Sequence, residues 1–192
     1  MEFKENLVIY EIDTQKSFMK AKADFLEIGE KIQLSFVNFD KDTGKSSSSI
    51  DVYMKISEAK RLCQDILSGR VAAEIQKPEY KYGKMYAQGG VSEDKCAQRG
   101  LRTDGKALSK QFKIMAGNKM PFILIGEERP GVSEMITRPD GTKVPGIIKP
   151  LSGKAEKQIM VACTAENLKE MALMMDAYIN AFINRKVNKY FG

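Results

Sequence analysis

The chain of 192 residues contains no histidine and little cysteine. The absence of an imidazole excludes Ser-His-Asp and Cys-His hydrolases, His-ligated zinc enzymes and histidine phosphotransfer. The three cysteines Cys63, Cys96 and Cys163 are widely spaced and form no CxxC pair, so we expect free, buried thiols in a reducing cytoplasm.

Long apolar runs are also missing. The most apolar stretches, such as Met120 to Ile125, fall far short of the roughly 20 residues that span a bilayer. The N-terminal residues Met1 to Glu5 lack the basic start and apolar core of a signal peptide. We therefore expect no membrane association and a cytoplasmic location.

The positive charge of the chain is concentrated in one segment. Lysine and arginine number 31 against 25 acidic residues, a net charge of +6. Residues 77–119 contain ten basic and four acidic residues, so the rest of the chain is balanced. Such a segment indicates nucleic acid first, and an anionic membrane or an acidic protein second; a solvated loop in a mildly basic protein has the same composition.

Alternating apolar residues predict strands in the first half. Residues 31–39 and 46–56 alternate on either side of an Asp- and Gly-rich turn, which is typical of an antiparallel hairpin. Ser57 fits the N-cap of a helix that Gly69 ends. A short strand is predicted at 7–10, and the stretch from 14 to 25 fits either a helix or an edge strand.

The same order returns in the second half. Strands are predicted at 122–125, 147–148 and 157–163, and Thr164 fits the N-cap of a long helix. Additional apolar positions on that helix indicate that it lies across a sheet or in an oligomer.

The predicted fold class is α+β, with an antiparallel sheet, two strand-then-helix halves and a long C-terminal helix. We interpret residues 1–192 as one domain. It is either a structural duplication with halves near 1–76 and 77–192 or a coincidental repetition of the same order.

No motif indicates catalysis. Gly44, Lys45 and Ser46 resemble the end of a phosphate-binding loop, but Phe39 occupies the position of the required glycine and a strand follows in place of a helix. We expect no catalytic residues, no cofactor and no metal. An enzyme that uses carboxylates and a metal would need three acidic residues in one cleft.

Residues 80–86 interleave tyrosines with lysines. In a strand, Tyr80, Tyr82, Lys84 and Tyr86 would share one face, with Lys81 on the other. Aromatic rings stack on exposed bases and lysines neutralise phosphates. The same pattern also fits a strand whose tyrosines pack on the core, and the sequence leaves both interpretations open.

Basic residues continue beyond this stretch. Arg99 and Arg102 lie in a predicted flexible loop, and Lys106, Lys110 and Lys113 have helical spacing if residues 107–115 form a short helix. They would then line a surface that follows a nucleic-acid backbone, or simply a solvated helix face. The candidate nucleic-acid-binding residues are Tyr80, Lys81, Tyr82, Lys84, Tyr86, Arg99, Arg102, Lys106, Lys110 and Lys113.

The order of strands, capped helix, strands and long final helix from Ile32 to Ile183 resembles the Whirly-type arrangement. That arrangement is related to the fold of the positive-cofactor transcriptional coactivator, which binds single-stranded DNA. Gly105, Lys106, Ala107 and Leu108 resemble part of the Lys-Gly-Lys-Ala-Ala-Leu element of plant Whirly proteins, but they follow the first predicted helix, whereas the family's element precedes it. The resemblance implies strands that hold nucleic acid and helices that drive oligomerisation.

We therefore expect a non-enzymatic protein that binds single-stranded nucleic acid, DNA rather than RNA, without sequence specificity and as a homo-oligomer. The sequence contains no recognisable module for the major groove of duplex DNA. The alternative is a protein-interaction or assembly module of a phage or mobile element, whose basic segment docks an acidic partner.

Overall fold

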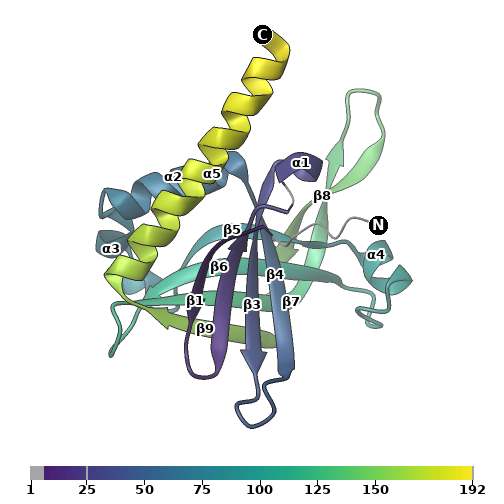
Figure 1. Cartoon of the computed structure of the whole chain (residues 1–192). Helices are drawn as coiled ribbons and strands as arrows, with labels where there is room; N and C mark the ends of the chain where they lie inside the picture. The colour runs from purple at the N-terminus through teal and green to yellow at the C-terminus, as the bar shows by residue number, and fades with distance from the viewer. Residues whose placement is uncertain (1–6, 25, 192) are drawn as a thin grey trace.

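Nine strands form two antiparallel sheets in the computed structural model of the chain, which describes residues 7–24 and 26–191 (Figure 1). The expectation about a signal peptide at residues 1–5 lies outside the described residues, as does Phe25, the last residue of the ambiguous stretch. The fold is α+β with a long C-terminal helix, as the sequence predicts.

The first sheet has its four strands in sequence order. These are β1 (Val8–Asp13), β2 (Ser17–Lys22), β3 (Lys31–Phe39) and β4 (Ser46–Lys55), with α1 (Leu26–Gly29) between β2 and β3. The predicted hairpin is confirmed, since β3 and β4 pair from Lys31 with Lys55 to Phe39 with Ser46. The ambiguous stretch is a strand, β2, because Met19 and Ala21 alternate with half-exposed residues and are buried in the core.

The second sheet has the order β5-β6-β7-β8, and β9 also pairs with β7. The strands are β5 (Lys84–Val91), β6 (Ala107–Ala116), β7 (Phe122–Thr137), β8 (Lys143–Pro150) and β9 (Lys157–Cys163). The first half of β7 pairs with β9 and its second half with β8, so β7 is the strand that joins the two parts of the sheet.

One longer helix follows the strands of each half, α2 (Ile56–Leu67) after the first sheet and α5 (Ala165–Phe191) after the second. Shorter elements are α3 (Arg70–Glu74), the 3-10 turn η1 (Pro78–Tyr80) and α4 (Glu93–Gln98). The N-cap predicted at Thr164 is confirmed, because the amide of Asn167 donates to the Thr164 hydroxyl at 3.1 Å. The N-cap predicted at Ser57 is wrong, because the N-cap of α2 is Lys55, whose amide donates to the Glu58 carboxylate at 3.0 Å.

The core lies between the sheets, whose strands cross one another in Figure 1. Phe36 of β3 and Phe112 of β6 contact each other across it, with ring centroids 5.9 Å apart. A Cβ atom on Gly126 of β7 would lie 2.6 Å from the Phe36 ring, so this close approach requires a glycine. Helices α2 and α5 pack together, and Lys60 bonds to Asp176 at 3.0 Å between them.

Two elements project from the body in Figure 1: the C-terminal part of α5, and the arm formed by the second half of β7 with β8. The additional apolar residues Leu173 and Met174 of α5 are exposed. Among the described residues, none of the helices combines the length and apolar character needed to cross a membrane.

Two local predictions are wrong. Residues 80–86 are not one strand, because Pro78 begins a 3-10 turn and Gly83 has a φ of +94°, so that β5 starts at Lys84. Residues 107–115 are not a helix but most of β6, in which Phe112 and Ile114 are buried in the core. Lys110 and Lys113 therefore point to opposite faces of the sheet and do not share one surface.

Candidate nucleic-acid interface

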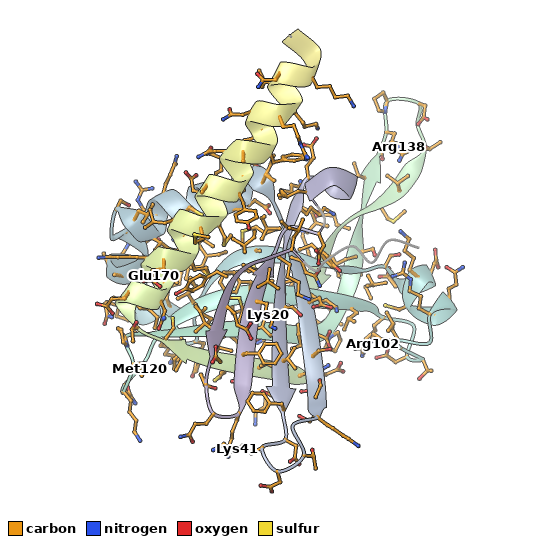
Figure 2. The ribbon with its side chains drawn as sticks, viewed as in Figure 1. Lys20, Lys41, Arg102, Met120, Arg138 and Glu170 are labelled. Carbon is orange, nitrogen blue, oxygen red and sulfur yellow. The ribbon has the colours of Figure 1, made fainter. Side chains whose placement is uncertain are left out.

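The predicted site residues lie along the hairpin of β5 and β6 and its two ends. Tyr80, Lys81 and Tyr82 precede β5, whereas Arg99, Arg102 and Lys106 lie in the connection to β6. Figure 2 shows Arg102 and Met120 at opposite ends of the second sheet, and the tyrosines belong to the Met120 end because Lys84 pairs with Ile114. The structure thus separates the tyrosines from the arginines by the length of the hairpin.

Lys84 lies between two of the three tyrosines. Its ammonium is 5.4 Å from the centre of the Tyr80 ring and 5.5 Å from that of Tyr86, and it forms an ion pair with Glu74 of α3. Tyr86 packs beside Phe112, with 6.4 Å between the ring centroids. Burial raises the pKa of the Tyr86 hydroxyl, and nearby Glu74 adds to this. Tyr86 is therefore part of the packed structure.

Tyr82 is the exposed member of the set, with 76% of its surface accessible. The Lys81 ammonium lies over its ring, 4.8 Å from the centroid. The next residue, Gly83, lies against the second sheet, because a Cβ at that position would be 3.2 Å from the Cβ of Lys113. Tyr82 and Lys81 thus form an exposed aromatic and cationic pair at the border of that sheet.

Arg102 is engaged with two carboxylates. Its guanidinium donates to Asp104 at 2.7 Å and to Glu156 at 3.0 Å, and only 9% of its side chain is exposed. Hydrogen bonds to Glu156 and Asp104 raise the pKa of Arg102, and the bond from Arg102 lowers the pKa of Asp104. Lys106 lies 3.7 Å from Asp104. Arg99 is exposed and makes no ion pair within the described ranges.

Carboxylates from outside the basic segment compensate much of its charge. Lys110 pairs with Glu128 at 3.0 Å and Lys113 with Glu127 at 2.8 Å, both on β7. Glu74 and Glu156 serve Lys84 and Arg102 in the same way. Much of the +6 charge excess of residues 77–119 is therefore neutralised by carboxylates from outside the segment, which only the fold brings close to it.

The outward face of the second sheet is polar at its centre. One row across the strands contains Gln88, Gln111, Glu127 and Gln158, and Arg129 lies beside it, opposite Ser109. Glu127 is 1% exposed and accepts hydrogen bonds from Lys113, Arg129 and Gln158. Sequence reasoning missed Arg129 and the glutamines; reading 107–116 as a strand would have placed Gln111 and Lys113 together.

The first sheet has a groove of about 510 Å³ on its outward face. Phe18 and Phe39 line it, with ring centroids 6.1 Å apart, together with Glu11 and Asp13. Lys20 lies 4.9 Å from the Phe18 ring and pairs with Glu11 at 3.1 Å. Sequence reasoning missed these aromatic residues because the secondary structure of 14–25 was ambiguous and the local charge is balanced.

Within residues 7–24 and 26–191, no group of three or more acidic or cysteine side chains is placed to hold a metal ion. The cysteines Cys63 and Cys163 are buried, and burial raises the pKa of each thiol to about 12. Comparison with protein families and with curated proteins found no family model and no sequence that matches this chain.

Proposed function

We propose that the chain binds single-stranded nucleic acid, DNA rather than RNA, without sequence specificity and without catalysis, on the outward face of the second sheet. The observation that supports this most is the exposed Tyr82 beside Lys81 at the border of a polar sheet face. A base stacks on an open aromatic ring while a neighbouring ammonium neutralises the adjoining phosphate.

The distribution of charge favours the second sheet over the first. The outward face of the first sheet presents the carboxylates of Glu11, Asp13 and Asp51, which repel phosphates, among the lysines Lys20, Lys22, Lys31 and Lys55. On the second sheet, the carboxylate of Glu127 is buried and bonded to two cations. A polyanion therefore meets less negative charge on the second sheet.

The order of the elements supports the resemblance to the Whirly arrangement. Strands β1 to β4 precede α2, and strands β5 to β9 precede α5, so each half consists of antiparallel strands followed by a helix. With this resemblance we also propose a homo-oligomer in the cytoplasm. The arm of β7 and β8 presents Val132, Met135, Ile136 and Ile147 to solvent, and these apolar residues suit a contact between copies.

Fluorescence anisotropy with a labelled oligothymidine tests the proposal. We expect binding at low salt that weakens steeply as salt rises, because phosphate contacts release counterions. Tyr82→Ala should weaken binding by roughly five- to 150-fold, the loss that corresponds to one stacked base. Absence of binding at low salt, or unchanged affinity of Tyr82→Ala, contradicts the proposal.

A matched pair of lysine variants separates a local contact from net charge. Lys81→Gln and Lys169→Gln each remove one exposed positive charge, but Lys169 lies on α5, the helix that packs on α2 and on β1 of the first sheet. We expect Lys81→Gln to weaken binding and reduce its salt dependence, and Lys169→Gln to do neither. Equal effects would mean that binding follows net charge alone.

A second candidate is a protein-interaction or assembly module of a phage or mobile element that docks an acidic partner. The exposed apolar arm favours assembly, because soluble proteins seldom leave such residues uncovered on a projecting hairpin. Stoichiometric association with an acidic protein, together with indifference to single-stranded DNA, would select this function over the first.

A further inference from the structure

Glu127 is a charged group at the centre of the outward face of the second sheet, yet only 1% of it is exposed. One carboxylate oxygen, Oε1, accepts from the Lys113 ammonium at 2.8 Å and from Nε of Arg129. The other, Oε2, accepts from the amide of Gln158 at 3.1 Å. The carboxylate thus holds the ammonium of Lys113, on the neighbouring strand β6, close to the guanidinium of Arg129, on its own strand β7.

Both cations keep donors that Glu127 does not use. An ammonium has three N–H groups and a guanidinium has five. Lys113 donates to Glu127, and Arg129 donates to Glu127 and, through Nη1, to the carbonyl of Gly153 at 2.7 Å. Among the described residues, the remaining N–H groups have no acceptor, while 14% of the Lys113 side chain and 22% of the Arg129 side chain are exposed.

We propose that Lys113 and Arg129 form a phosphate-contact site for the backbone of the single strand, and that Glu127 is the positioning residue that fixes them there. This inference rests on the proposed function and deepens it, because it names the residues on that sheet face that bind the backbone phosphate. Glu127 orients the two cations but also cancels one of their two charges. Arg129 belongs to this site although its charge lies outside the basic segment of the sequence.

Substitution of Glu127 by glutamine therefore separates its role in positioning Lys113 and Arg129 from the effect of its negative charge. Glu127→Gln keeps the size of the side chain and one acceptor oxygen, and it removes the charge that competes with a phosphate. We expect tighter binding of oligothymidine by roughly two- to fivefold, the range of one partly exposed charge pair. The slope of log K against log salt should become steeper by about 0.7, as for one more neutralised phosphate on a single strand.

Glu128 provides the control on the same strand. Glu128→Gln makes the same change in net charge, but Glu128 lies on the opposite face, where it pairs with Lys110 at 3.0 Å and lies 3.8 Å from Lys157. Affinity for oligothymidine should change little in this variant. Equal strengthening by both variants would show a general effect of charge and would overturn the inference.

A second pair of variants decides the question if Glu127→Gln does not fold. Lys113→Gln and Lys20→Gln each remove a lysine that is paired with a carboxylate on the outward face of a sheet, Lys20 on the first sheet. We expect Lys113→Gln to weaken binding and to flatten the salt dependence by about 0.7, and Lys20→Gln to change neither. The inference is overturned if the two behave alike.

The outcomes distinguish the inference from the proposed function. If the unaltered chain does not bind oligothymidine at low salt, the proposed function fails and the inference fails with it. If the unaltered chain binds but folded Glu127→Gln binds no more tightly than Glu128→Gln, only the phosphate-contact site is refuted. A melting temperature for each variant identifies those that fold.

Discussion

Substitution of Gly126 by alanine tests how closely the two sheets pack. Gly126 lies on β7 and faces Phe36 of β3, which is fully buried and contacts Phe112. A methyl group at this position would lie 2.6 and 2.7 Å from two ring carbons of Phe36 and 3.1 Å from its Cβ. Carbon atoms in contact prefer about 3.5–4.0 Å, so the ring or the strands must move by roughly 1 Å.

The magnitude follows from two opposing effects. Overpacking a closely packed core costs typically about 1–3 kcal/mol, whereas replacing a strand glycine by alanine recovers about 0.5–1 kcal/mol of backbone entropy. We expect Gly126→Ala to lower the free energy of unfolding by roughly 1–2 kcal/mol. For a domain of this size, the melting temperature should fall by roughly 2–8 °C.

Urea unfolding and thermal melting measure this loss, and Gly89→Ala is the control. Gly89 lies in β5 with no atom within 4 Å of its built Cβ, so alanine there should be neutral or slightly stabilising. Combining Gly126→Ala with Phe36→Leu should cost less than the sum of the two single changes, because a smaller side chain relieves the clash. If Gly126→Ala is as stable as Gly89→Ala, the sheets do not approach each other as described.

Three further predictions concern buried and projecting groups. Tyr86→Phe should keep or raise the melting temperature, because the buried Tyr86 hydroxyl has no hydrogen-bond partner among the described residues; a marked loss would reveal a partner. Burial acts to raise the pKa of Glu127, but hydrogen bonds from Arg129 and Lys113 outweigh it and hold the pKa below its usual value of 4.5. The stability that this lowered pKa supplies is present above about pH 4.5 and is lost as pH falls through the folded-state pKa. In urea titrations, the free energy of unfolding should therefore fall less steeply with acid in Glu127→Gln than in the unaltered chain. The two slopes should differ by at most about 1.4 kcal/mol per pH unit. Equal acid slopes in the two proteins would refute this. Met135→Gln with Ile136→Gln on the arm should reduce the oligomeric state seen by sedimentation without changing the melting temperature of the fold, and an unchanged oligomer would exclude the arm from the interface.

The strand pattern could be predicted where one face of a strand is buried. Residues 31–39 and 46–56 alternate because Leu34, Phe36 and Val52 enter the core while their neighbours face outwards, and the same reasoning located β9. The prediction failed where apolar and charged residues satisfy two periods at once. Lys106, Lys110 and Lys113 have helical spacing, but the alternating Phe112 and Ile114 decide that the segment is a strand.

The tyrosine segment shows a limit of a different kind. Tyr80, Tyr82 and Tyr86 look equivalent in the sequence, yet Tyr82 is exposed while Tyr86 packs beside Phe112. Tyr80 and Tyr82 precede Gly83, which has a positive φ, whereas Tyr86 follows it and lies in β5, which pairs with β6. Because strand register depends on the partner strand, no local pattern distinguishes these three rings.

By itself, the sequence determined the α+β class, the two strand-then-helix halves and the N-cap at Thr164, because these depend on local periodicity and local hydrogen bonds. It also located the excess positive charge in residues 77–119. Only the tertiary structure decided which of those charges remain available, since the compensating carboxylates Glu127, Glu128 and Glu156 come from distant strands and loops. Electrostatic interactions depend on distance in space and not on separation along the chain. The candidate interface is therefore defined only in the folded chain, where strand pairing places these carboxylates beside the basic residues.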